Sequence, residues 1–299
     1  MLGWRILYGR LTNGRLGVGV DHSPTVRGRR LMREVKRLRE SSGMSPDEAA
    51  RRLDFSKSKL YRIENGKSRI DADDLEDMLD LYDVRSPDRD ALVALGRDSR
   101  RRGWWTTYKD VFTGSYVGLE YEAARIQVAS HIVPGLFQTP EYARAVIAET
   151  RPALDADEVE RRVAARVARQ QAVLHRDNAP DIHVVLDEAG LHRKVGGEQV
   201  MMQQLAGLAK VSAQPGITLQ VLPFAAGASA ALEGDFVILA FPDPEDTPVA
   251  YAEGLFGDLY LESKEELDRY SLAWTHLLDK ALSPAESAAL ISELLQEDP

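Results

Sequence analysis

Apolar residues recur at helical spacing through the first hundred residues of the chain. From Val26 to about Arg39 they alternate with basic residues, and the small residues after position 40 end this helical pattern. Ser45 predicts the start of a second short helix because a serine side chain caps a helix and Pro46 fits its first position. Three more helices are expected at Ser56–Asn65, Leu75–Tyr82 and Arg89–Arg97.

Beyond residue 100 the pattern becomes mixed, with helical stretches alternating with short β-branched runs. The runs are bounded by glycine, proline and aspartate, which is typical of strands. We expect helices at Leu119–Ser130, Pro140–Glu149, Ala156–Leu174, Glu198–Ala213, Lys264–Leu282 and Pro284–Leu295. We expect strands at Ile182–Leu186, Thr218–Leu222, Phe236–Phe241 and Val249–Ala252.

These patterns predict a mainly α protein with an α+β part. Residues 25–100 are expected to form a five-helix DNA-binding domain, and residues 101–299 a mixed α/β domain for regulation, dimerisation or partner binding. Residues 1–24 have no periodicity. They are predicted to be a disordered arm or sequence upstream of the true start.

Charge divides unevenly between these parts. The net charge of the chain is −9, but residues 25–70 carry 14 basic and 6 acidic residues, a balance of +8. Residues 71–299 carry 21 basic and 40 acidic residues, a balance of −19. Such asymmetry indicates that the first part meets a polyanion, unless the charges are merely scattered over solvated faces.

Composition excludes several classes of protein. The chain has no cysteine, which removes disulfides, thiolate metal sites and cysteine nucleophiles. No apolar run approaches the roughly 18 residues that span a bilayer, and arginines interrupt the apolar N-terminus where a signal peptide would need an apolar core. A cytoplasmic, nucleoid-associated protein without membrane contact is therefore expected.

The segment Ser45–Gly66 is the most informative in the chain. Ala50 is small enough to lie where two crossing helices come closest, and the apolar residues after it would be buried between them. A basic polar face remains on the second helix of the pair. Such a face fits the major groove of DNA, so the segment predicts a helix-turn-helix. The alternative is a generic helical hairpin with a solvated basic face.

The predicted DNA contacts follow from side-chain chemistry. Lysine and arginine donate to guanine O6 and N7 or to phosphate, and serine makes short contacts to either. Glu64 would repel DNA, so we expect it to pair with Arg37 or Arg33. The basic first helix is expected to add affinity. The candidate DNA-binding residues are Ser56, Lys57, Ser58, Lys59, Arg62, Lys67 and Arg69.

Residues 25–85 resemble the lambda-repressor-like, xenobiotic-response-element (XRE) type of helix-turn-helix regulator. The resemblance is carried by Ser56-Lys-Ser-Lys-Leu-Tyr-Arg-Ile-Glu-Asn-Gly66. It implies the five-helix fold and DNA binding through the helix that starts after Ser56. The sequence departs from the family in having Pro46-Asp47 in place of the phosphate-binding glutamine, and Asp54 in place of the glycine in the turn.

Residues 104–295 resemble the uncharacterised domain of actinobacterial WhiJ-like regulators. The resemblance implies an actinobacterial source and a regulator encoded beside a small partner protein, with antitoxin-like members. The matching segments are Gly118–Ala123, Val133–Arg144, Arg166–Gln170, Val185–Leu191, Gln220–Gly227 and Gly234–Pro242.

Features of an enzyme are weak in this second part. The histidines are scattered without metal-ligand spacing, so neither a metal nor a cofactor is expected. Asp187-Glu188 could be paired carboxylates, but a strand end or helix cap is favoured. Trp104-Trp105 could form a ligand platform, but an aromatic anchor between domains is favoured. The glycine-rich Gly227–Gly234 has no lysine and predicts only a loop beside a pocket or a partner surface.

Three hypotheses follow. The first is a non-enzymatic, sequence-specific DNA-binding transcriptional regulator that acts as a homodimer and is controlled through its C-terminal domain. The second is an antitoxin-like protein that binds a small partner encoded nearby and uses DNA binding for autoregulation. The third is a C-terminal domain that binds a small-molecule effector or acts as an enzyme.

Overall fold

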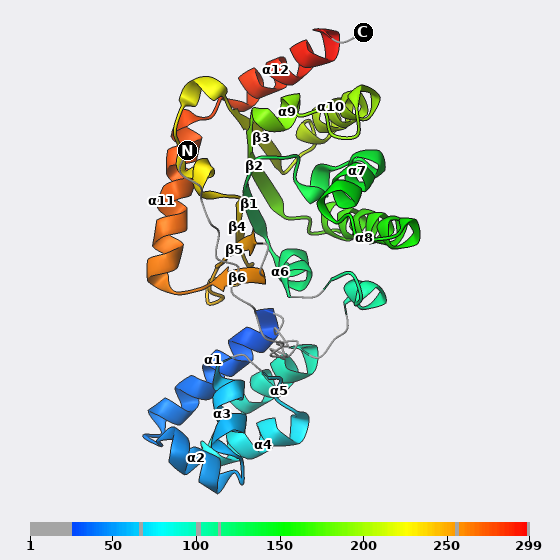
Figure 1. Ribbon diagram of the computed structural model, residues 1–299. Coiled ribbons are helices and arrows are strands. Elements are labelled where there is room, and N and C mark those ends of the chain that lie inside the picture. The colour runs from blue at the N-terminus through cyan, green and yellow to red at the C-terminus, as the bar shows by residue number, and fades with distance from the viewer. Residues whose placement is uncertain (1–25, 66–67, 100–102, 113–114, 255–256, 298–299) are drawn as a thin grey trace, which may run out of the picture.

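The computed structural model describes residues 26–65, 68–99, 103–112, 115–254 and 257–297. The predicted arm at residues 1–24 therefore lies outside the described residues. A small helical domain is followed by a larger domain with a central sheet (Figure 1). This arrangement confirms the predicted fold class. No helix in the described ranges combines the length and the apolar character that crossing a bilayer requires.

The N-terminal domain consists of five α-helices around one apolar core. The core is built from the residues that the helical periodicity picked out, including Leu31, Val35, Leu75 and Met78, all nearly inaccessible to solvent. The helices are α1 (Val26–Ser41), α2 (Pro46–Arg52), α3 (Lys57–Glu64), α4 (Ala72–Leu81) and α5 (Asp88–Ser99).

A six-stranded sheet forms the centre of the second domain within the described residues, in the order β3-β2-β1-β4-β5-β6. The first three strands are parallel and the last three antiparallel. The strands are β1 (Arg125–Ser130), β2 (Asp181–Asp187), β3 (Ile217–Leu222), β4 (Phe236–Ala240), β5 (Val249–Gly254) and β6 (Gly257–Leu261).

Helices cover both faces of the sheet (Figure 1). Successive side chains of a strand point to opposite faces, so Val184 faces one apolar core and Val185 the other. Trp274 and Leu277 of α11 close the second core. The helices are α6 (Tyr116–Glu122), α7 (Pro140–Thr150), α8 (Ala156–Leu174), α9 (Ala189–His192), α10 (Glu198–Ser212), α11 (Lys264–Lys280) and α12 (Pro284–Glu297), with short 3₁₀ turns at Trp104–Tyr108, Gly135–Phe137, Phe224–Ala226 and Ala230–Glu233.

One sequence expectation about the sheet is wrong, and one strand had no expectation. The helix expected over Leu119–Ser130 ends at Glu122, and its second half is the central strand β1. Ile126 and Val128 of this strand are buried between β2 and β4, so pairing on both sides overrides the helical tendency of the alanine and arginine around them. The edge strand β6 was not predicted at all, because most of its residues are exposed.

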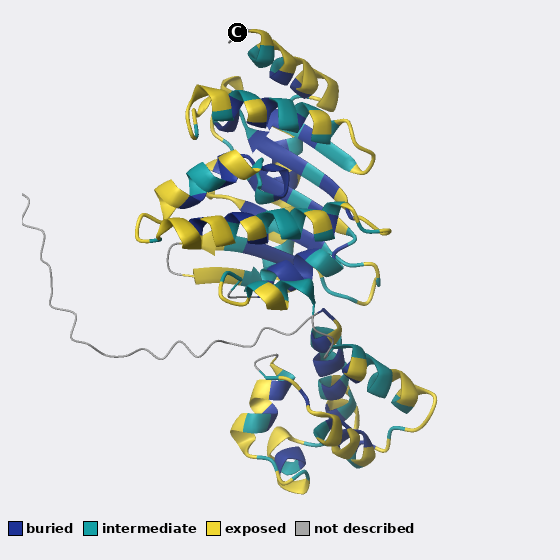
Figure 2. Cartoon of the chain, turned by 90° about the vertical axis from the view of Figure 1, so that its right-hand side faces the viewer, coloured by how far each residue is buried: buried dark blue, intermediate teal, exposed yellow. Residues whose placement is uncertain are grey.

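The first turn of α1 belongs to the core of the second domain. Val26 is 6% exposed and lies in the same apolar cluster as Leu119 and Ile126, whereas Leu31 and Val35 lie in the core of the N-terminal domain. Figure 2 shows the buried residues of both domains, along the strands of the sheet in the larger one and along the helices in the smaller one. Helix α1 therefore has one end in each core.

Candidate nucleic-acid interface

Two capped helices form the predicted helix-turn-helix. The Ser45 hydroxyl accepts a hydrogen bond from the Glu48 amide at 3.2 Å, and the Ser56 hydroxyl accepts one from the Lys59 amide at 3.1 Å. Each serine thus satisfies an amide that the helix itself leaves unpaired. Ser56, a predicted DNA contact, therefore caps α3. It is exposed at the N-terminus of this helix.

The turn between α2 and α3 depends on Asp54. Its φ of 55° lies in the left-handed region, which aspartate tolerates better than most residues. Ala50 of α2 is 2% exposed, and Leu60 and Ile63 of α3 are 1% exposed, so the small alanine lets the helices pack closely. The burial of these residues, with Leu53 and Phe55 half-buried beside them, follows the sequence analysis.

The outer face of α3 combines cationic and polar side chains. Lys57, Ser58 and Arg62 are exposed, and Arg62 makes no ion pair with any residue that the structure describes. Tyr61 is 57% exposed between them, and the sequence analysis missed it. An aromatic residue next to Arg62 on a basic helix face was the signal that could have found it. Arg69 is exposed beyond α3, and Lys67 lies outside the described residues.

Both lysines of α3 already have acidic partners. Lys57 Nζ lies 2.5 Å from a carboxylate oxygen of Asp47 in α2, and both side chains are largely exposed, so phosphate can replace this weak pair. Lys59 Nζ lies 2.7 Å from Asp74 of α4, whose side chain is 17% exposed, and 3.8 Å from the Phe55 ring centroid. Lys59 therefore ties α3 to α4 as well as lying near the outer face.

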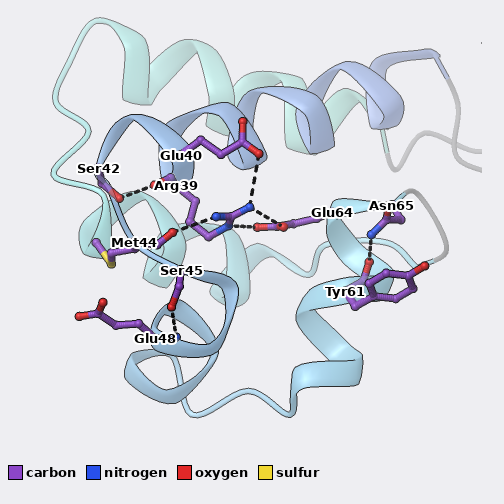
Figure 3. Close-up of polar contacts among 9 residues, drawn as sticks. All are labelled: Arg39, Glu40, Ser42, Met44, Ser45, Glu48, Tyr61, Glu64 and Asn65. Atoms are coloured by element: carbon purple, nitrogen blue, oxygen red, sulfur yellow. Dashed lines mark hydrogen bonds and ion pairs between the residues drawn. The ribbon is translucent and has the colours of Figure 1, made fainter. Parts of the chain in front are cut away.

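A buried ion pair anchors the end of α3. The Arg39 guanidinium donates to both carboxylate oxygens of Glu64, at 2.6 and 3.1 Å, and to the Met44 carbonyl at 2.9 Å (Figure 3). The two side chains are 7% and 6% exposed. The hydrogen bond to Glu64 raises the pKa of Arg39. Burial, reinforced by the Glu64 charge, raises the pKa of Tyr82 beside them to about 12.

The expected partners of Glu64 were therefore wrong. Arg37 pairs with Glu34 within α1, at 2.8 Å, and Arg33 faces the other domain. Residues 33 and 37 are one turn apart on one face of α1, whereas Arg39 points from a different face toward α3. Glu64 is thus neutralised inside the domain and does not oppose DNA from an exposed position.

The basic first helix contacts the second domain through three arginines. Arg33 donates to the Thr247 hydroxyl and to the Glu245 carbonyl, both at 3.1 Å, and lies 3.4 Å from Asp246. Arg30 pairs with Asp243. Arg29 pairs with Glu262.

This arrangement gives the arginines of the basic first helix a second role, and the expectation that this helix adds DNA affinity stays a prediction. The charge count predicts that the arginines of α1 bind a polyanion. In the structure, carboxylates of the second domain pair with three of them. Burial lowers the pKa of Arg29, whose side chain is 13% exposed, and raises the pKa of Asp246, whose side chain is 10% exposed. The N-terminal half of α1 is consequently an interdomain contact.

The residues that the sequence offered as signs of an enzyme make ordinary contacts with their neighbours in the fold. Asp187 accepts a hydrogen bond from the Ala189 amide at 2.8 Å, and Glu188 accepts one from the Phe224 amide at 2.6 Å, as expected for a strand end. Trp105 lies against Tyr121 of α6, 5.7 Å between ring centroids, a contact within the second domain, and its role as an anchor between domains stays a prediction. Within the described ranges, histidines, aspartates and glutamates form no group that could hold a metal ion.

Two domain families match the chain. The helix-turn-helix domain matches residues 30–92, which include α2, α3 and α4, so the first domain is a helix-turn-helix domain of the class that indicates a DNA-binding regulator. The family described as a domain of unknown function (DUF5753) matches residues 113–293, more than half of the chain, and the chain belongs to this family. No curated protein and no solved structure matches the chain.

Proposed function

We propose that the protein is a sequence-specific transcriptional regulator of the XRE type that reads the major groove with the N-terminal part of α3. The single observation that carries this proposal is the exposed face of Lys57, Ser58 and Arg62 on a capped helix within a helix-turn-helix domain. Helix α2 lies at the end of this domain that points away from the sheet (Figure 1). The second domain therefore leaves this end of the helix pair accessible.

Removing Lys57 and Arg62 together tests the DNA-binding face. The double alanine variant should bind an operator, selected with the wild-type protein from random DNA, at least about 10-fold more weakly, because base contacts contribute about 1–3 kcal/mol each. Its salt slope should fall by about 1 for each phosphate-binding cation that is removed. Fluorescence anisotropy at several salt concentrations measures both. Lys59 is left in place because it also ties α3 to α4.

Arg85→Ala is the matched control for this experiment. Arg85 is an exposed arginine of the same domain, 83% accessible, and among the described residues it pairs only with Asp83, so its removal changes charge without touching α3. Wild-type affinity and salt slope in the Lys57/Arg62 variant would contradict the proposal, and so would an equally weakened Arg85 variant.

We further propose that the second domain controls the DNA-binding domain through the contact between α1 and residues 243–247. Arg30 and Arg33 meet Asp243 and Asp246 across this contact, and opposite charges fix the orientation of two surfaces. A regulator that binds as a homodimer depends on that orientation, because the spacing of its two recognition helices must match the two half-sites. Homodimerisation belongs to this proposal.

Charge exchange across the contact tests this control. The Arg30→Asp/Arg33→Asp and Asp243→Arg/Asp246→Arg variants should each change operator affinity several-fold, because like charges would face each other. The fourfold exchange should restore both the affinity and the wild-type radius of gyration measured by small-angle scattering. If both reversed variants show α1 displaced from residues 243–247 and still bind the operator with unchanged affinity, control through this contact is contradicted.

The assignment of the second domain to the WhiJ-like group remains part of the proposal. It is supported by the way three of the segments that carry the resemblance meet. Glu120 of the first segment binds Arg169 of the third, and Gln170 of the third donates to the Gly135 carbonyl of the second at 2.8 Å. Segments far apart in the chain thus form one packed unit.

A further inference from the structure

Three arginines lie on one side of α8, at positions 162, 166 and 169, and they differ in how their charge is balanced. Arg169 donates two hydrogen bonds of 2.6 Å to Glu120, whose side chain is 1% exposed. Arg162 is partly buried, and burial, with Arg151 nearby, lowers its pKa. Arg166 is the partly buried arginine between them.

Arg166 has no carboxylate partner among the described residues. Its guanidinium donates to the amide oxygen of Gln138, a neutral group, and lies against Gly135. Burial, reinforced by the positive charge of Arg169, lowers the pKa of Arg166 to about 10. Removing a cation from water is costly unless an anion accompanies it. A guanidinium has five N–H donors, so most of those of Arg166 remain available.

A carboxylate that acts on the charge of Arg166 is that of Glu253, near the C-terminal end of β5. It lies 3.9 Å from Arg151, and the two side chains are 67% and 50% exposed, so it is a loosely held solvent-exposed carboxylate. Its charge acts on Arg166 as well. Arg151 and Glu253 form an exposed pair, and the charges of both act on the partly buried Arg166, so two cations and one anion interact here.

We propose that Arg166 and Arg151 bind a small oxyanion, a phosphate or a carboxylate, in competition with Glu253. Arginine suits this ligand because its planar fork donates two parallel hydrogen bonds to such a group. Gly135 has no side chain to hinder the approach, and the backbone around it is fixed by Gln138 and Gln170, which donate to the carbonyls of Val133 and Gly135 at 2.8 Å. The ligand balances the charge that the fold leaves uncompensated.

The site lies beside the hairpin that meets the DNA-binding domain. Glu253 lies in β5, next to its last residue, and β5 pairs with β6. Arg29 of α1 lies over the ring of Tyr260 in β6, 5.8 Å from its centroid. A ligand at Arg166 is therefore placed one hairpin away from α1. The binding itself does not depend on the proposed function, and it is measured without DNA.

Titration of the full-length protein with inorganic phosphate and with malonate, at constant ionic strength, tests the proposal. Calorimetry and the shift in melting temperature should show saturable binding of at least one of the two, and the difference between them identifies phosphate or carboxylate chemistry. Arg166→Gln should weaken this binding at least about 10-fold, since hydrogen bonds to charged groups are strong. Arg151→Gln should weaken anion binding several-fold. Because Arg151 is exposed, this variant keeps the test valid if the Arg166 variant fails to fold.

Two further variants sharpen the outcome. Glu253→Gln removes the competing carboxylate and should tighten anion binding several-fold. Arg144→Gln is the matched control, because Arg144 is a half-buried arginine of α7 paired with Glu160, and its removal should leave anion binding unchanged. The proposal is overturned if neither anion saturates the wild-type protein. It is also overturned if the folded Arg166 and Arg151 variants bind like the wild type, or if the Arg144 variant is weakened as much.

Discussion

Glu64→Ala is expected to destabilise the helix-turn-helix domain by about 3–5 kcal/mol, the cost of removing one partner of a buried ion pair. The substitution leaves the Arg39 guanidinium, 7% exposed, without its carboxylate in the core between α1 and α3. Among the described residues, only the Met44 carbonyl and the 3.6 Å contact with Glu40 would then remain as partners of Arg39. Since domains are stable by only about 5–15 kcal/mol, this change removes a large part of the total.

Urea denaturation followed by circular dichroism measures this effect. Glu34→Ala is the control, because Glu34 pairs with Arg37 at the surface and its removal should cost less than about 1 kcal/mol. Removing a negative charge near DNA would by itself strengthen binding. Weaker operator binding by the Glu64 variant would therefore mean that the domain is partly unfolded. A stability within about 1 kcal/mol of the wild type would show that the pair does not anchor α3.

Glu120→Ala is expected to destabilise the second domain by a similar amount, about 3–5 kcal/mol. Glu120 receives both hydrogen bonds of Arg169 and one from the Tyr116 hydroxyl at 2.9 Å. Burial and the nearby carboxylate raise the pKa of Tyr116 well above its ordinary value, so the phenol stays neutral and would be left without an acceptor. The variant thus removes the hydrogen-bond acceptor of both the Arg169 guanidinium and the Tyr116 hydroxyl.

Differential scanning calorimetry of the full-length protein measures this destabilisation. Glu160→Ala is the control, since Glu160 pairs with Arg144 on exposed parts of α7 and α8. The Glu120 variant should lower the transition of the second domain far more than the control. Equal melting of the two variants would mean that the Arg169 charge is compensated in another way.

The features of the DNA-binding domain that were predictable from the sequence are local ones. Ser45 and Ser56 predict the starts of two helices because capping depends on residues within three positions of the serine. The burial of Leu60 and Ile63 follows from their spacing on one short helix. The turn at Asp54 could be placed for the same reason, since a left-handed residue must separate helices that are this close.

The features that were missed depend on contacts between distant segments. Strand β1 contains glutamine, alanine and arginine, and only pairing with β2 and β4 makes it extended. The partner of Glu64 depends on how α3 crosses α1, which helical spacing does not give. The charge count was correct for residues 25–70 but could not show that Arg30 and Arg33 face carboxylates more than 200 positions away.

Helix α1, with one end in each core, has the geometry of a lever for the proposed control. It has 16 residues and is about 24 Å long at 1.5 Å per residue. A tilt of about 10° at the Val26 end would move the far end by about 4 Å, which exceeds the 3.4 Å step between successive phosphates of one DNA strand along the helix axis. In the proposed control, a small displacement of the loop at residues 243–247 would therefore be enough to shift the contacts of α3 by one base pair.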